Sequence, residues 1–92
     1  MIDAMKKQSL SEFTRAEFLD FVGRIFRAEA PTEREGNSWT LHFDELVAPN
    51  PQGYDLIYRP AEGVEDSPEG VVGEVERYCR EHGLPCFKDS EV

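Results

Sequence analysis

The chain has 92 residues, of which 19 are acidic and 10 are basic, so its formal net charge is −9. A chain of this length forms one domain with a modest hydrophobic core, which leaves no room for a deep catalytic cavity. The negative charge repels nucleic acid and anionic membrane surfaces, so we expect neither as a direct partner and favour a basic protein.

The apolar stretches are too short to span a bilayer, and the first nine residues lack the apolar centre of a signal peptide. We therefore expect a cytoplasmic protein, monomeric when free, that folds as a single domain over residues 1–92. Residues 1–10 show no periodicity and are expected to form a frayed arm, and residues 89–92 a short tail. Two cysteines are too few for a disulfide-stapled scaffold.

A first helix is predicted from a capping box, Thr14 to Glu17, in which a threonine precedes a glutamate by three residues. The apolar residues that follow recur at helical spacing and predict a core-facing helix of about four turns. They are Phe18, Leu19, Phe21, Val22, Ile25 and Phe26.

A second helix is predicted after Pro31, because Thr32 to Glu35 forms another capping box. It should run to about Ala48. Its inward stripe is Trp39, Phe43, Leu46 and Val47. Residues 36–38 are poor helix formers, so packing must hold that turn in place.

Residues 54–60 lie between prolines and are long enough for a short strand or for one to two helical turns. The local pattern alone favours the strand. A last helix should begin after Ser67, an N-cap residue followed by Pro68 at the first helical position, and end at Gly83. Three helices and one short element predict an antiparallel helical bundle.

Negative charge concentrates in residues 29–69, which hold ten acidic residues against Arg34 and Arg59, a net charge of −8. Such a run is often only a solvated face. However, Tyr54 and Tyr58 lie in its middle, and tyrosines among carboxylates are typical of a hot spot that binds a basic partner. The alternative, that one of these tyrosines only plugs the bundle, stays open here.

No motif predicts catalysis or a cofactor. The glycines lack the lysine and strand context of a phosphate-binding loop. Cys79, His82 and Cys86 offer three metal ligands without a fourth, so no metal site is expected. His42 lies between Leu41 and Phe43 and is expected to be a packed or interface histidine.

Five segments in this order resemble the colicin and pyocin immunity proteins, which protect a bacterium from its own nuclease bacteriocin. They are residues 13–19 (FTRAEFL), 42–43 (HF), 53–60 (GYDLIYRP), 66–72 (DSPEGVV) and 83–88 (GLPCFK). The resemblance spans about residues 10–88, and its most specific parts are the runs at 55–60 and 66–72.

The resemblance implies an all-α fold, a distorted antiparallel four-helix bundle with Asp55 to Tyr58 as a short third helix in place of the strand. It also implies that the chain binds the nuclease domain of a bacteriocin at an exosite beside the active site, and excludes nucleic acid by charge and bulk. The expected toxin-binding residues are Glu33, Gly36, Asn37, Thr40, Leu41 and Asp44 on the second helix and Tyr54, Asp55, Tyr58, Arg59 and Pro60 around the third.

Three departures concern the partner. Arg59 stands where many relatives carry a second aromatic residue, and Gly36 and Asn37 where they often carry aliphatic ones. These differences predict a toxin other than the well-known DNases and leave a diverged DNase and an RNase both open.

Two other classes of function are compatible with parts of the sequence. Asp66 and Ser67 at a helix start resemble the attachment site of a carrier protein, but Pro68 makes Ser67 a plain N-cap. The second alternative is an acidic helical regulator, or nucleic-acid mimic, that binds a basic nucleic-acid-binding protein.

Overall fold

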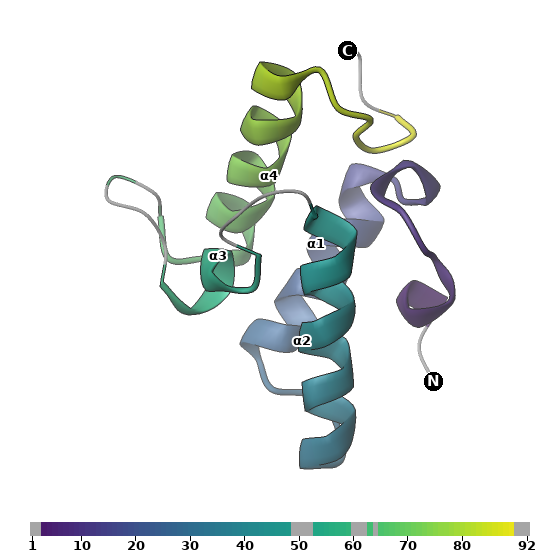
Figure 1. Ribbon diagram of the computed structural model, residues 1–92. Helices are drawn as coiled ribbons and strands as arrows, with labels where there is room; N and C mark the ends of the chain where they lie inside the picture. The colour runs from purple at the N-terminus through teal and green to yellow at the C-terminus, as the bar shows by residue number, and fades with distance from the viewer. Residues whose placement is uncertain (1–2, 49–52, 60–62, 64, 90–92) are drawn as a thin grey trace.

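The computed structural model describes residues 3–48, 53–59, 63 and 65–89. Within these residues the chain forms four α-helices, α1 (Arg15–Phe26), α2 (Glu33–Val47), α3 (Asp55–Tyr58) and α4 (Pro68–His82), preceded by two short 3-10 helices (Asp3–Lys6 and Leu10–Glu12). Figure 1 shows α1 between α2 and α4, and α3 on the side of the bundle away from both chain ends. The predicted all-helical bundle is confirmed, and no strand occurs among the residues described.

The three predicted helix starts are confirmed by their capping bonds. Thr14 Oγ1 accepts a hydrogen bond from the Glu17 backbone N–H at 3.0 Å, and Glu17 Oε1 accepts one from the Thr14 N–H at 2.8 Å. That second bond lowers the pKa of the Glu17 carboxyl below its usual value. Thr32 Oγ1 accepts from the Glu35 N–H and Ser67 Oγ from the Gly70 N–H, each at 3.1 Å. The capping box predicted at Thr32 to Glu35 is thus only half formed, because the Glu35 side chain makes no return bond to the Thr32 N–H. These local signals set where each long helix begins.

Phe18 lies at the centre of the core. Its ring centroid is 5.2 to 6.3 Å from those of four other phenylalanines, Phe13, Phe21, Phe43 and Phe87. The predicted inward stripe of α2 is fully buried, and α4 contributes Val71, Val72, Val75 and Cys79. On α1 the stripe is buried at Phe18, Phe21 and Val22, whereas Leu19, Ile25 and Phe26 are only partly buried. The core therefore joins all four helices and the segment that follows α4.

Two expectations from the sequence are corrected. The strand favoured locally for residues 54–60 is wrong, because Asp55–Tyr58 is helical. Adjacent residues of a strand face opposite sides, but Leu56 and Ile57 are both buried, which a helical turn allows. The expected frayed arm also differs from the structure: Asp3–Lys6 is a 3-10 helix, and Leu10 is buried in the core.

His42 is packed, as predicted. Its Nε2 lies 2.9 Å from the Ala4 carbonyl oxygen, and its ring meets the Phe21 ring edge to face, with centroids 6.0 Å apart. The contact ties the N-terminal 3-10 helix to α2. It also gives this N-terminal segment a tertiary contact although its residues carry no periodic pattern.

The cysteines are free and buried. Burial, and then the neighbouring Cys86, raises the pKa of the Cys79 thiol to about 12, so this thiol stays protonated at neutral pH. His82 instead packs on Tyr78, with ring centroids 4.1 Å apart. The described residues contain no group of three or more metal-ligating side chains. No helix in the described part of the chain is long and apolar enough to cross a membrane.

α1 ends in a Schellman motif whose left-handed residue is alanine. The Ala28 N–H donates to the Ile25 carbonyl and the Glu29 N–H to the Arg24 carbonyl, each at 3.1 Å, while Ala28 has a φ of 52°. Glycine is the usual residue there, because a Cβ strains this conformation. The motif ends α1 after 12 residues, somewhat short of the four turns predicted.

We expect Ala28→Gly to raise the free energy of unfolding by about 0.5 to 1 kcal/mol, because relief of the left-handed strain exceeds the added entropy of the unfolded chain. Urea denaturation measures it. Ala16→Gly on the exposed start of α1 is the control, and it should destabilise the protein. A loss of stability in both variants would contradict the argument.

Candidate functional site

Two tyrosines at the ends of α3 are exposed to solvent, while the two residues in its middle are buried. Leu56 and Ile57 fill the gap beside α4, while Tyr54 and Tyr58 are 47% and 58% exposed. The two tyrosine rings meet edge to face, with centroids 6.0 Å apart. The alternative that one tyrosine only plugs the bundle is therefore wrong, because the aliphatic pair does so.

Thr40 of α2 contacts the outer tyrosine. Its Oγ1 lies 3.2 Å from Tyr58 Oη and also donates to the Gly36 carbonyl oxygen at 3.2 Å. A hydroxyl has one hydrogen to donate, so Tyr58 is the donor toward Thr40. This bond fixes the direction of the exposed Tyr58 ring relative to α2.

Asp44 contacts the beginning of α3. Its Oδ1 accepts a hydrogen bond from the Tyr54 backbone N–H at 3.0 Å, and its side chain is half-buried. Gly53 has a φ of 48°, and a Cβ built there would lie 2.0 Å from the same Oδ1. The sequence placed Asp44 with Glu33 among the expected toxin contacts, but its carboxylate is already engaged within the protein.

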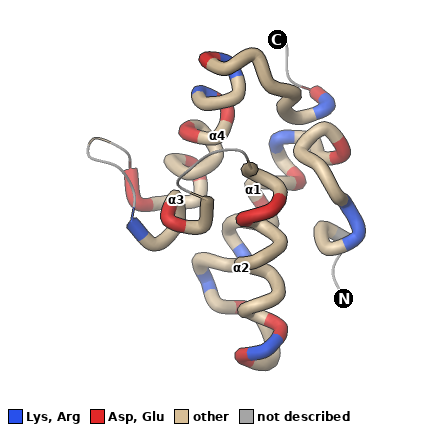
Figure 2. Tube along the Cα trace, viewed as in Figure 1, with Lys and Arg blue, Asp and Glu red and all other residues tan. Residues whose placement is uncertain are grey.

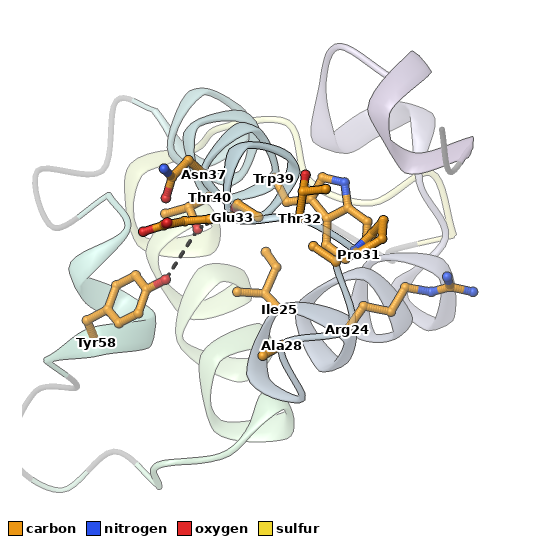
Figure 3. Close-up of a pocket in the computed structure, with 12 residues that line it drawn as sticks. Arg24, Ile25, Ala28, Pro31, Thr32, Glu33, Asn37, Trp39, Thr40 and Tyr58 are labelled. Atoms are coloured by element: carbon orange, nitrogen blue, oxygen red, sulfur yellow. Dashed lines mark hydrogen bonds between the residues drawn. The ribbon is translucent and has the colours of Figure 1, made fainter.

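A cleft of about 320 Å³ opens between the end of α1, the first half of α2 and Tyr58. Figure 3 shows Glu33, Asn37, Thr40 and Tyr58 gathered at one side of it, with Pro31 and Trp39 at the other and Ile25 between them. The missing side chain of Gly36 keeps this part of α2 open: an added Cβ would lie 3.6 Å from the Ala30 Cβ. One large side chain of a partner fits a space of this size.

Trp39, which lines the cleft, has a buried donor without an acceptor among the residues described. The residue is 4% exposed, and the donor is its indole Nε1–H. A buried unsatisfied donor costs about 1 to 3 kcal/mol. Arg24 also lines the cleft, with its charge paired to Asp20 at 2.9 Å.

Negative charge surrounds the tyrosines. Figure 2 shows acidic residues on α2, on α3 and in the segment that leads into α4. Glu33 is exposed and has no ion-pair partner in the described part of the chain, and Asp55 is half-buried in α3. Arg59 after α3 and Arg34 beside Glu33 are both exposed, so cations also lie within this acidic surface.

The structure brings most of the expected toxin-binding residues into two groups. Glu33, Gly36, Asn37, Thr40 and Tyr58 line the cleft, and Asp44 holds Tyr54. Leu41 is 62% exposed on α2 and does not line the cleft. Pro60 lies outside the described residues.

Sequence reasoning missed the contribution of α1 to this surface. Arg24 and Ile25 of α1, together with Ala28 and Pro31 of the segment that connects α1 to α2, line the cleft. The signal available was the short connection between Phe26 and Glu33, which brings the end of α1 beside the start of α2.

Comparisons with known proteins agree on one family. The model of the family described as colicin immunity protein / pyocin immunity protein matches residues 10–81. The pyocin-S1 immunity protein of Pseudomonas aeruginosa and the pyocin-S2 immunity protein of its strain PAO1 are each 44% identical over 85 residues, 89% of this chain and 97% of the relative.

Two solved structures share the fold. One chain comes from the crystal structure of the mutant nuclease domain of pyocin S8 with its cognate immunity protein; it has a TM-score of 0.80 and 32% identity, over 89% of this chain and 99% of that chain. The other comes from the pyocin AP41 DNase–immunity complex, with a TM-score of 0.80 and 29% identity, over 91% of this chain and 100% of that one. The α2–α3 surface thus belongs to a protein of known kind: this chain is a member of the colicin and pyocin immunity protein family.

Proposed function

We propose that this protein binds and inhibits the nuclease domain of a bacteriocin, and so protects the cell that makes the toxin. The observation that carries the proposal is the pair of exposed tyrosines on α3 within an acidic surface, in a chain of the immunity family. Relatives in this family are immunity proteins, inhibitors rather than enzymes, which agrees with the lack of a catalytic motif in the sequence. The site of action we propose is the cytoplasm, where the toxin would meet nucleic acid.

Charge explains how such a surface recognises a nuclease. A domain that grips a phosphate backbone must be cationic, so an acidic face meets it with complementary charge. Opposite charges steer the two proteins together and speed association, in a way that salt screens. The bound protein, which carries a net charge of −9, then repels nucleic acid from the nuclease as well as blocking it by bulk. Binding at an exosite beside the catalytic centre is sufficient for this effect.

Tyrosine explains how the complex stays together. Tyr, Trp and Arg are the residues that most often carry interface binding energy, and they do so in well-packed central positions. Tyr54 and Tyr58 occupy the middle of the acidic surface, and the cleft beside Tyr58 can receive one side chain of the nuclease. Gly36 and Asn37 line this cleft, so the nuclease side chain that enters it would help to determine which toxin is recognised.

The partner we propose is a DNase domain. Support comes from the pyocin AP41 complex, in which the nuclease is a DNase, and whose matched chain shares the fold. Arg59 is one of the three departures seen in the sequence, and we infer that it faces a carboxylate of its own toxin.

The alternative function is that of an acidic regulator that binds a housekeeping nucleic-acid-binding protein. The family match favours the immunity function. The Ser67 Oγ accepts a hydrogen bond from the Gly70 N–H at 3.1 Å, the arrangement of a plain N-cap, and this removes the support for a carrier protein.

The experiment is a titration of this protein against the nuclease domain encoded beside its gene, with binding and the cleavage of DNA and of RNA followed together. We expect tight one-to-one binding and loss of DNA cleavage at equivalence. Binding without loss of cleavage would contradict the inhibition. If the nuclease domain cleaves RNA and not DNA, the partner is an RNase. The absence of binding would leave the acidic regulator as the better explanation.

Glu33→Ala is expected to slow association with the nuclease about threefold at low ionic strength and to reduce its salt dependence, because the change removes an exposed steering charge. Stopped-flow mixing over a series of salt concentrations measures this. Thermal stability should change little, since Glu33 has no ion-pair partner among the described residues.

Glu81→Ala is the matched control for charge. Glu81 is exposed at the end of α4, far from the beginning of α2 (Figure 1), and its removal alters the net charge by the same amount. It pairs with Arg77 at 2.9 Å, and Arg77 keeps its other partner, Glu74, when Glu81 is removed. Association should keep its wild-type rate in this variant. Equal slowing by both substitutions would show that only net charge matters, and a change confined to the dissociation rate would rule out steering by Glu33.

A further inference from the structure

We propose that Asp44 is a positioning residue, which holds α3 and its two tyrosines in the binding orientation, rather than a charge that meets the nuclease. The expected effect on nuclease binding rests on the proposed function. The positioning contact itself is argued from the geometry of the free protein. It changes the role expected for Asp44 from the sequence.

α3 cannot hold its own shape. It has four residues, and helices much shorter than about 12 residues are marginal in water. Three of its N–H groups are satisfied by the first turn, in which Leu56 donates to Gly53 and both Ile57 and Tyr58 donate to Tyr54. The Tyr54 N–H precedes this turn and has no carbonyl acceptor within it. Asp44 Oδ1 supplies the acceptor from another helix at 3.0 Å.

Gly53 shows how closely the chain approaches Asp44. It is buried, has a φ of 48°, and a Cβ at this position would lie 2.0 Å from Asp44 Oδ1 and 3.1 Å from its Cγ. Only glycine allows both this backbone conformation and this approach. An aspartate that served only as a surface charge would need neither, so the pair of Gly53 and Asp44 indicates a built contact.

A second contact one turn away works in the same direction. Thr40 and Asp44 are four residues apart and so lie on one face of α2. Tyr54, the N-cap of α3, and Tyr58, its last residue, have the same spacing. Asp44 holds the backbone of Tyr54 at 3.0 Å, and Thr40 holds the hydroxyl of Tyr58 at 3.2 Å. α2 therefore fixes both ends of α3, and a change in α2 reaches the binding tyrosines without touching the nuclease.

The test compares two substitutions of Asp44. Asp44→Asn removes the charge and keeps an oxygen that accepts the Tyr54 N–H, whereas Asp44→Ala removes both. We expect the Tyr54 amide to exchange with deuterium at least about tenfold faster in free Asp44→Ala, and the nuclease complex of this variant to dissociate at least about tenfold faster. Asp44→Asn should restore both rates to within about threefold of the wild type.

Gly53→Ala should reproduce the effect of Asp44→Ala, because the new Cβ displaces the carboxylate. Gly63→Ala is the matched control: Gly63 also has a positive φ, 86°, but an added Cβ would meet nothing within 4 Å. It carries the backbone strain without the clash and should leave the Tyr54 exchange rate unchanged.

Two outcomes would overturn the proposal. If Asp44→Asn slows association as much as Asp44→Ala and leaves the Tyr54 amide protected, Asp44 acts as a contact charge. If Asp44→Ala leaves both exchange and dissociation unchanged, it has no positioning role. Exchange in the free protein needs no nuclease, so a failure of the wild type to bind one would count against the proposed function alone.

Discussion

Replacement of Tyr58 by alanine is expected to weaken binding of the nuclease domain by at least about 2 kcal/mol, roughly a 30-fold rise in Kd. The ring is 58% exposed in the free protein, so it is available to a partner and contributes little to the core. Its hydroxyl is held by Thr40, which limits the ring to one direction before binding and lowers the entropy cost of association. Surface plasmon resonance or calorimetry measures the loss.

Tyr58→Phe separates the ring from the hydroxyl. It retains the aromatic contact and loses the bond to Thr40, so its loss of affinity should be much smaller than that of Tyr58→Ala. Thermal unfolding should show that both variants stay folded. Wild-type affinity in folded Tyr58→Ala would remove this tyrosine from the binding surface.

Phe18→Ala is expected to lower the free energy of unfolding by about 3 to 5 kcal/mol, because it removes a fully buried ring and leaves a cavity. The ring contacts four other phenylalanines, from the segment before α1, from α1 itself, from α2 and from the segment after α4. A domain of this size has only about 5 to 15 kcal/mol of stability, so the variant should be close to unfolding at 37 °C. Urea denaturation measures the change.

Phe26→Ala is the matched control on the same helix. Phe26 is only partly buried at the end of α1, so its truncation should cost clearly less than that of Phe18. An equal loss in the two variants would contradict the central place of Phe18 in the core.

The long helices were predictable because their signals are local. Thr14, Thr32 and Ser67 each cap a helix through a bond to an N–H three residues later, and that relation is visible in the chain. The buried stripe of α2 follows from its spacing in the same way. The third helix was not predictable from its own residues, since seven residues between prolines suit a strand equally well. The resemblance to the immunity proteins supplied it correctly.

The proposed binding surface was predictable in composition but not in geometry. The sequence shows acids around Tyr54 and Tyr58, and the structure places both tyrosines on the outside. The sequence alone does not show that the Asp44 carboxylate accepts a hydrogen bond from the backbone of a residue ten positions later. Nor does it show that the end of α1 forms one wall of the cleft. Both are tertiary contacts, set by how α2 lies against its neighbours.

The positions of α2 and α3 make the two parts of the surface interdependent. Thr40 and Asp44 belong to the helix expected to select the toxin, yet each bonds to a tyrosine of the helix expected to anchor it. Substitutions at these positions and at Tyr58 should therefore be non-additive in their effects on affinity. Replacing α2 residues by those of a relative would then change the position of the α3 tyrosines as well as the choice of toxin.

The measurement that tests the account most directly is amide hydrogen exchange of this protein, free and in complex with its nuclease domain. We predict slower exchange in the complex across residues 33–44 and 54–58, with residues 76–82 at the far end of α4 unchanged. Protection confined to α1 or to the end of α4, with α3 exchanging as in the free protein, would contradict the assignment of the α2–α3 surface as the nuclease-binding site.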